Sequence, residues 1–211
     1  MSSSIAIQTK PERYHHGDLK NTLLEAAREL ANEIGVDNFT LREVARRANV
    51  SPAAPYHHFL DKQDLIRTLA IEAFRKLTTA LEQAKQKKHS PLEQLEHIGI
   101  AYVMFAYEHH AEFRFMFRRE LCAAAGEPDP LEVAGIDAQS VLYNTILEAQ
   151  VVKKIMTSDA KNISLMLWSV VHGLSTILLE SPISKTATAE SAKKMARIVV
   201  QQAIQGILSK E

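Results

Sequence analysis

Apolar residues recur at the three- and four-residue spacing of a helix face along almost the whole of this 211-residue chain. Helix-start signals punctuate the pattern, because Thr40 and Ser90 each have a Glu three positions later and Asp129 stands before a Pro. No alternation of apolar and polar residues is long enough for a strand, and only 7 Gly and 7 Pro interrupt the chain. These features predict an all-α protein built from long helices.

The start and stop signals predict nine helices. They are expected over residues 18–34, 41–48, a short segment after Ser51, 61–88, 91–109, 111–124, 130 to the mid-150s, 159–180 and 188–209. The first three are predicted to form a helix-turn-helix domain over 18–60, preceded by a flexible arm over 1–17. The remaining helices are predicted to form a larger body over 61–211.

The overall composition is that of a folded protein without a charge bias. Basic and acidic residues both number 25, so net charge gives no support for nucleic-acid binding. The single cysteine, Cys122, excludes an intrachain disulfide and suits a reducing, cytoplasmic location. The first 17 residues lack the apolar core of a secretion signal, and the most apolar run, 163–180, is interrupted by serines, a histidine and a glycine. We therefore expect that run to be a buried helix rather than a membrane span.

Residues 40–62 carry the pattern of a helix-turn-helix. Small Ala45 and Ala48 stand where the two helices would cross, and Asn49 stands where the tight turn needs a left-handed backbone. Positive charge is also concentrated here, since the basic residues are Arg42, Arg46, Arg47 and Lys62 and the acidic ones are Glu43 and Asp61. Neither feature decides the function, because such a helix pair is also a common core element and a basic face is often merely solvated.

The identities of the residues add a family likeness. The matching positions are Thr40, Val44, Ala45, Ala48, Val50, Ser51, Tyr56, His58, Phe59, Lys62 and Leu65. Together they resemble the DNA-binding domain of TetR/AcrR-type transcriptional regulators, although Asn49 replaces the usual Gly. The preceding RYHHGDLK, 13–20, resembles the start of the first helix in many members, and nine helices match the family's architecture.

A narrower likeness concerns the C-terminal half. Trp168 and the pair His172-Gly173, together with FRFMF at 113–117, resemble a subgroup whose C-terminal domain carries a Trp-His-Gly signature. That subgroup often has Pro where this sequence has His110.

The resemblance implies a DNA-binding regulator, usually a repressor, that binds a pseudo-palindromic operator in double-stranded DNA as a homodimer and answers to a small-molecule effector. The implied DNA-backbone contacts are Thr40, Ser51, Tyr56, Lys62, Arg42 and Arg46, and the implied base-reading positions are Pro52, Ala53, Ala54 and His57. Three of the four reading positions offer only hydrocarbon, which suits thymine methyl groups and leaves His57 as the polar reader.

Two prolines in the predicted reading helix are unusual. Pro52 is expected at its first position after a Ser51 cap, where the missing N–H has no helical partner. Pro55 is expected at the fourth position, where it forgoes one hydrogen bond to the Ser51 carbonyl. We therefore expect the first turn of this helix to tighten or open slightly.

The resemblance also implies a dimer interface and an effector pocket in the body. The last two helices are expected to form the interface through Ser169, Gly173, Ala196, Val199, Val200, Ala203 and Ile207, with an ordinary intrachain core as the alternative. The candidate pocket residues are Tyr102, Phe105, Phe113, Met116, Phe117, Cys122, Tyr143, Leu147, Met166 and Trp168, many of which fit a core role equally well. The implied effector is small and largely apolar or aromatic.

Two other classes of function compete with a regulator. An enzyme lacks support, because no nucleophile elbow, phosphate loop or zinc-protease motif occurs. Glu93 and His97, four residues apart, have the spacing of metal ligands but also that of a very common surface pair, and we expect neither a metal nor a cofactor. A helical small-molecule-binding module without DNA activity, or an activator, remains the alternative.

Overall fold

The computed structural model describes residues 16–86, 89–121, 129–182 and 186–208. The N-terminal arm up to residue 15 and Cys122 lie outside the described residues. The chain divides into two compact units, Met1–Lys62 and Gln63–Glu211, and each is considered by itself below.

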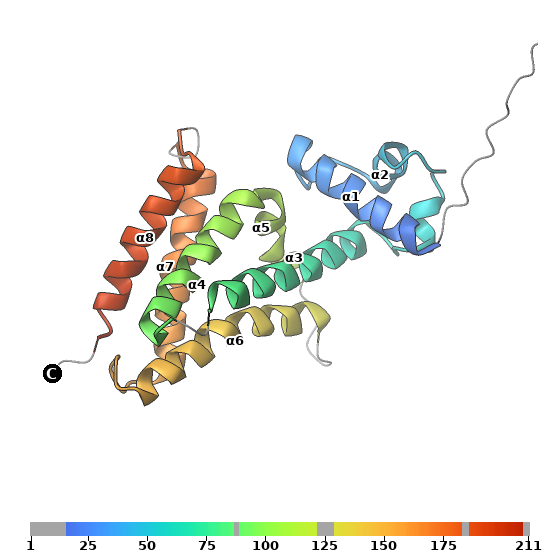
Figure 1. Ribbon diagram of the computed structural model, residues 1–211. Coiled ribbons are helices and arrows are strands. Elements are labelled where there is room, and N and C mark those ends of the chain that lie inside the picture. The colour runs from blue at the N-terminus through green and yellow to red at the C-terminus, as the bar shows by residue number, and fades with distance from the viewer. Residues whose placement is uncertain (1–15, 87–88, 122–128, 183–185, 209–211) are drawn as a thin grey trace, which may run out of the picture. The chain divides into compact units, whose positions relative to one another are not determined.

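The first unit contains α1 (His16–Ile34), α2 (Leu41–Arg47) and the single-turn 3-10 helix η1 (Ala54–His57) (Figure 1). Gly35, with φ of 85°, follows the last residue of α1, as the sequence predicts. Thr40 begins α2 through the predicted capping box, because its hydroxyl accepts from the Glu43 amide while the Glu43 carboxylate accepts from the Thr40 amide at 2.7 Å.

The turn after α2 has the predicted left-handed residue. Asn49 has φ of 55°, its amide donates to the carbonyl of Arg46, and the next amide, of Val50, donates to Ala45 at 3.0 Å. This pair of hydrogen bonds is a Schellman ending, which Asn tolerates better than most residues with a Cβ. Ala45 and Ala48 are buried where the helices approach, so the helix-turn-helix of the sequence is confirmed.

The third element differs from the prediction, because it is one 3-10 turn and not an α-helix starting at Pro52. An α-helix from that point would need the amide of residue 55 to donate to the Ser51 carbonyl, and Pro55 has no N–H. The Ala54 amide donates to that carbonyl instead, at 3.0 Å, one residue earlier than in an α-helix. The turn begins at Ala54, so Pro55 lies at its second position, where no intrahelical donor is lost.

The second unit consists of six α-helices and a second 3-10 turn. They are α3 (Lys62–Ala84), which begins one residue before the unit boundary, α4 (Pro91–Glu108), α5 (His110–Met116), η2 (Arg119–Leu121), α6 (Pro130–Val151), α7 (Ala160–Glu180) and α8 (Ala189–Gln205). The described residues thus hold eight α-helices, and the ninth expected helix corresponds to η1. The aromatic α5 is shorter than the predicted 111–124. The only strand-like pairing in the described part is one isolated bridge, Ile155 to Leu208, so the all-α class is confirmed.

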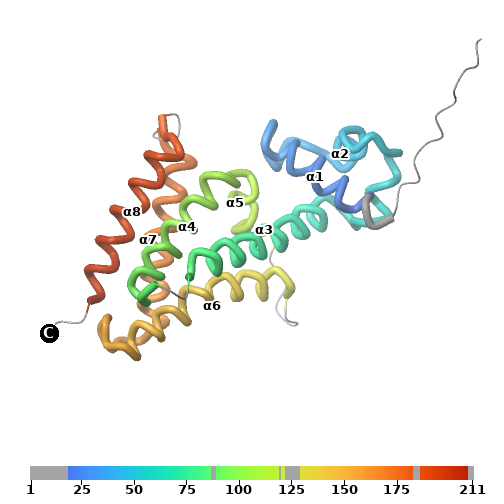
Figure 2. Tube along the Cα trace, in the orientation of Figure 1, coloured from blue at the N-terminus to red at the C-terminus, as the bar shows by residue number. Residues whose placement is uncertain are grey.

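Helix α4 is central to the second unit. It packs against α6, α7 and α8, and α7 also packs against α6 and α8 (Figure 2). Its capping box at Ser90 forms as predicted. Gly99 allows α8 to pack close to α4, because a Cβ at this position would lie 2.8 Å from the side chain of Val200.

This packing corrects the expected role of α8. Ala196, Val200 and Ile207, predicted at a dimer interface, are almost completely buried within the single chain. Ala203 is half-buried and lines a cavity. The apolar face of α8 therefore serves the intrachain core, which was the alternative left open by the sequence, and Val199 is only half-buried.

Helix α7 is only partly covered. By length and composition it is the one helix of the described part that could cross a membrane, a weak indication that core helices also satisfy. Ile163, Leu167, Val171 and Leu178 are buried against the neighbouring helices. The opposite face is exposed, so the expected burial of this helix is only half achieved within one chain.

Candidate functional site

The three arginines of α2 lie in different environments. Arg47 reaches back to α1, where its guanidinium donates to Glu29 at 3.1 Å and to both carboxylate oxygens of Glu33 at 2.8 and 2.5 Å. The hydrogen bonds from Arg47 hold the pKa of Glu33 below its ordinary value. Arg42 and Arg46, four residues apart and so on one face, are exposed and have no ion pair among the described residues. This face of α2 carries two unneutralised positive charges.

Four exposed residues lie in η1 or directly before it. Pro52, Ala53 and His57 are open to solvent, and Tyr56 is 56% exposed with no hydrogen bond to its hydroxyl in the described part. Ala54 does not fit its expected reading role, because it is buried beneath the turn and its methyl group cannot reach a base.

Two predicted backbone contacts are engaged within the unit, and a third is not the helix cap that the sequence predicts. Lys62 Nζ donates to the Asp37 carbonyl at 3.0 Å and lies 4.6 Å from the centroid of the Phe39 ring. The Thr40 amide is used by the carboxylate of Glu43, and Ser51 is not the cap of η1, because the turn begins at Ala54 after Ala53. Of the residues expected to meet phosphates, Arg42, Arg46 and Tyr56 are therefore the least committed.

The sequence pairs Leu60 with Leu65 as a hydrophobic staple at the start of α3, which predicts that Leu60 is covered. Leu60 is 89% exposed two positions after the half-buried His58. An apolar side chain in that state is a candidate partner contact, but no sequence signal distinguishes it from a core leucine.

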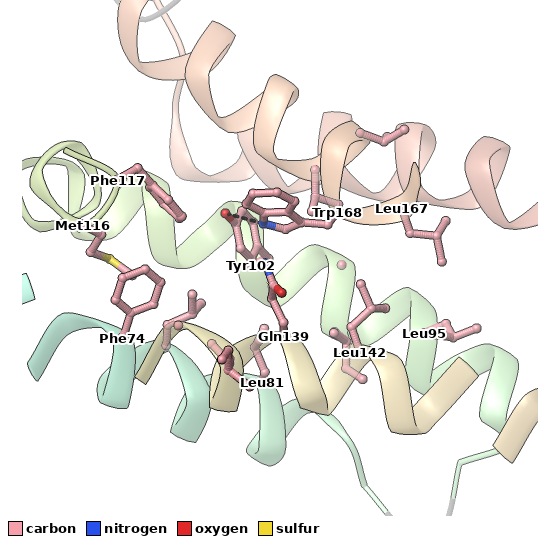
Figure 3. Close-up of a pocket in the computed structure, with 18 of the residues that line it drawn as sticks. Phe74, Leu81, Leu95, Tyr102, Met116, Phe117, Gln139, Leu142, Leu167 and Trp168 are labelled. Carbon is pink, nitrogen blue, oxygen red and sulfur yellow. Dashed lines mark hydrogen bonds between the residues drawn. The ribbon is translucent and has the colours of Figure 1, made fainter. Parts of the chain in front are cut away.

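The second unit encloses a cavity of about 590 Å³, within the size range of small-molecule sites. Five helices and the end of α5 contribute its wall, which is mostly aliphatic and aromatic (Figure 3). The lining residues used below are Phe74, Leu77 and Leu81 of α3, Leu95 and Tyr102 of α4, Met116 and Phe117, Gly135, Gln139 and Leu142 of α6, and Leu167 and Trp168 of α7.

Four of the ten predicted pocket residues line this cavity. They are Tyr102, Met116, Phe117 and Trp168. Phe105 and Phe113 are buried in the core outside it, and Leu147 and Met166 are exposed. Tyr143 lines a smaller neighbouring hollow of about 270 Å³, which shares Trp168 with the cavity.

An aromatic cluster carries the buried polar groups of the cavity wall. Trp168 Nε1 donates to the Tyr102 hydroxyl at 3.2 Å, and the same hydroxyl lies 2.9 Å from Nδ1 of His172. The imidazole of His172 lies among aromatic rings, with centroids 4.6 Å from Phe117 and 5.4 Å from Phe113. Burial raises the pKa of Tyr102 and lowers the pKa of His172, so both groups are neutral near pH 7.

Charged groups of the cavity wall are already paired or exposed. Asp129 accepts from the Leu131 amide at 2.9 Å and forms an ion pair with Arg67. Arg118 lies 3.6 Å from Glu120, and Glu132 is exposed. The described residues contain no group of three or more His, Cys, Asp or Glu placed to hold a metal ion, and the Glu93 carboxylate caps α4.

A pH prediction follows from the half-buried His172. Because burial lowers the folded pKa below the ordinary value of 6.5, the unfolded chain takes up this proton first as the pH falls. Stability is therefore expected to decrease below about pH 6.5, and His172→Gln should reduce that decrease. Urea unfolding at about pH 7.5 and about pH 5.5 measures it. His110→Gln, at an exposed position, is the control, and an unchanged pH dependence in His172→Gln would contradict the assignment.

A stripe of exposed residues with a half-buried glycine runs along α7. Leu165, Ser169, Gly173 and Ile177 recur every four residues and so share one face. Leu165 and Ile177 are 58% and 50% exposed, and nothing lies within 4 Å of where a Cβ on Gly173 would be. On α8, Ile198 is also 52% exposed. Isolated exposed leucines need no explanation, but an apolar stripe with a small-residue centre fits a partner helix.

Comparison with known proteins covers both units. Residues 23–69 match the bacterial regulatory proteins of the tetR family, and residues 95–202 match the tetracyclin repressor-like C-terminal domain. The chain is similar to the class A tetracycline repressor from transposon 1721 of Escherichia coli, with 46% identity over 50 residues, which are 24% of this chain and 23% of the relative. It is also similar to the HTH-type transcriptional repressor BepR of Brucella suis, with 31% identity over 116 residues.

The second alignment spans 54% of this chain and 56% of BepR, so neither curated relative is matched over two thirds of its length. Among solved structures, a protein of unknown function from Rhodococcus sp. RHA1 superposes with a TM-score of 0.79 at 31% identity, covering 94% of this chain and all of that one.

Proposed function

We propose, from the premise that this chain belongs to the TetR family and is a DNA-binding transcriptional regulator, that it is a cytoplasmic repressor working as a homodimer. In this proposal each subunit contributes one helix-turn-helix to a pseudo-palindromic operator, and a small apolar effector in the cavity weakens the complex. The observation that supports the proposal is the pair of exposed arginines on α2 without an ion pair in the described part of the chain, together with the exposed Tyr56 and His57 of η1.

The first unit, here called the DNA-binding head, would combine non-specific electrostatic attraction to phosphates with the reading of a few bases. Arg42 and Arg46 supply charge for phosphates, and Tyr56 can donate its hydroxyl proton to a phosphate oxygen. Pro52 and Ala53 offer hydrocarbon to thymine methyl groups, while His57 supplies the polar contact. Because Ala54 is buried, we assign base reading to these three residues only.

Dimerisation would cover the exposed stripe on α7. Two copies related by a two-fold axis would bring Leu165 and Ile177 of each subunit against the same face of the other, around Gly173. Since Ala196, Val200 and Ile207 are occupied in the intrachain core, we assign the interface to α7 and the exposed Ile198 of α8.

Effector binding would act through α3. Phe74, Leu77 and Leu81 of this helix line the cavity, and the helix begins at Lys62, the last residue of the first unit. A ligand alters DNA affinity only if it favours one position of α3 over another. The covalent continuity of α3 with the head supports it as the element that couples the two sites.

Selection of binding sequences from a random DNA pool tests the proposal. We expect a two-fold symmetric site whose affinity falls steeply with salt. Tyr56→Phe should weaken binding to all sequences by about five- to a hundredfold, because it removes one hydrogen bond to a phosphate per subunit and so two per dimer. His57→Ala should instead change the preferred base at one position in each half-site.

Three other outcomes of these experiments would contradict parts of the proposal. Without sequence-preferring binding at low salt, the chain would be a small-molecule-binding module. A uniform loss for His57→Ala would remove its role as a reader. Increased transcription from a promoter carrying the selected site would identify an activator.

A further inference from the structure

We propose that the cavity binds a neutral, elongated, mostly apolar molecule with one hydrogen-bond donor, which donates to the hydroxyl oxygen of Tyr102. This inference rests on the effector site proposed above and adds the chemistry of its ligand.

The shape of the cavity argues for an elongated ligand with two unlike ends. Figure 3 shows Phe74, Met116 and Phe117 at one side and Leu95, Leu142 and Leu167 at the other. The hydrogen-bonded pair of Tyr102 and Trp168 lies between these two groups. A ring with an aliphatic tail matches this division, because aromatic side chains favour ring contacts and the leucines favour alkyl chains.

The hydrogen bonds decide which polar group the ligand must carry. Trp168 Nε1 can only donate, so Tyr102 Oη accepts from it. With His172 neutral, the hydroxyl proton of Tyr102 is available for Nδ1, 2.9 Å away. Both donors of this pair are thereby used, and the polar capacity that remains is a lone pair on Tyr102 Oη. A ligand hydroxyl or N–H can donate to that lone pair without breaking either hydrogen bond.

A ligand with only acceptors is at a disadvantage. A ketone or ether oxygen beside Tyr102 finds no donor on Tyr102 or Trp168, so it would remain unsatisfied there, displace Trp168 or His172, or depend on the amide of the exposed Gln139. Desolvating a polar group without replacing its hydrogen bond costs about 1–3 kcal/mol in proteins. The cavity should therefore rank a donor above an acceptor of the same shape.

The charged residues of the cavity wall favour a neutral ligand over an anionic one. The described lining residues include one cation, Arg118, which already lies against Glu120. Of the two lining carboxylates, Asp129 is paired with Arg67, and Glu132 opposes an anionic ligand. A carboxylate beside Tyr102 would be desolvated without a counter-charge, so an ionised acid should bind weakly.

The chain provides its own binding signal, because Trp168 is its only tryptophan and lines the cavity. Fluorescence of the full-length protein can be titrated with four probes of similar shape: ortho-heptylphenol, ortho-heptylanisole, heptylbenzene and ortho-heptylbenzoate, whose polar group lies where the ring joins the tail, as Tyr102 lies between the two ends of the cavity. The phenol offers a donor, the anisole only an acceptor, the hydrocarbon neither, and the benzoate a negative charge.

We expect the phenol to bind about five- to tenfold more tightly than the anisole, and the benzoate to bind most weakly. Tyr102→Phe should reduce the preference for phenol over anisole to about twofold or less. Tyr107→Phe is the matched control, because this tyrosine is also on α4 but its hydroxyl donates to the Ala187 carbonyl away from the cavity. It should retain the full preference.

A second variant keeps the test independent of the stability of Tyr102→Phe. Gly135→Leu adds a side chain to the cavity wall, where a Cβ would meet only the Phe74 ring at 3.7 and 3.8 Å. It should weaken all four probes together, by about tenfold or more. Unchanged probe affinities in this variant would place binding elsewhere and overturn the inference.

The order of the four probe affinities is a second test of the proposed ligand chemistry. Tightest binding by the benzoate, equal binding of phenol and anisole, or an unchanged preference in Tyr102→Phe would each overturn the inference. None of these measurements contains DNA. A phenol that binds as expected but leaves operator affinity unchanged would remove the effector role from the proposed function and leave the ligand chemistry in place.

Discussion

Replacing both Arg42 and Arg46 with Gln is expected to flatten the salt dependence of operator binding. A dimer carries four such side chains, and each phosphate contact on duplex DNA contributes about 0.9 to the slope of log affinity against log salt. If all four meet phosphates, the slope should fall by about three to four. Near physiological salt the loss of affinity should be roughly a hundredfold or more, and equal for all sequences. Titrations at several salt concentrations measure both quantities.

Arg47→Gln is the matched control, because it removes the same charge from the same helix. The guanidinium of Arg47 is held by Glu29 and Glu33 of α1, so it is not free for a phosphate. The slope should change little in this variant. Equal effects of the single replacements Arg46→Gln and Arg47→Gln would show that ion pairing within the head does not decide which arginines meet DNA.

Much of the head was predictable because its signals are local. The capping box at Thr40 and the left-handed Asn49 each depend on a few neighbouring residues, and both form as the sequence predicts. The conformation of η1, which carries the proposed base-reading residues, was predictable only in part. Pro55 indicated a disturbed first turn, but the outcome depended on which residue begins the turn. A start at Ala54 instead of Pro52 buries Ala54 and removes it from the reading surface.

The cavity was less predictable, because it is a property of packing between helices. Aromatic and sulfur-containing residues were favoured as pocket residues, yet Phe105 and Phe113 are ordinary core residues. Leucines such as Leu81 and Leu142 line the cavity instead. An inward-facing leucine has the same periodicity whether it meets another side chain or an empty volume, so no pattern in one sequence separates the two.

The same limit explains the error on α8. Its apolar face was visible in the sequence, but periodicity does not identify the surface that covers it. The close approach of Gly99 to Val200 shows that α4 covers it within the chain. The proposed interface therefore moves to the residues of α7 that no helix of the chain covers.

The double replacement Leu165→Asp with Ile177→Asp is expected to produce monomers. Both residues lie on the exposed stripe of α7, so in a two-fold dimer each subunit would bring two carboxylates into an apolar contact. The separate subunits should keep their stability, because these positions are exposed. Operator affinity should fall by about 10²–10⁴, since the second head would no longer be held near its half-site. Light scattering coupled to gel filtration gives the mass, and a DNA titration gives the affinity.

Val133→Asp with Val151→Asp is the corresponding control on α6. These valines are also exposed, Val151 at 81%, but they lie outside the stripe. The control should remain dimeric and bind DNA normally. A Leu165→Asp, Ile177→Asp protein that stayed dimeric would place the interface on another surface. Loss of the dimer in both variants would mean that added negative charge alone, and not the α7 stripe, drives dissociation.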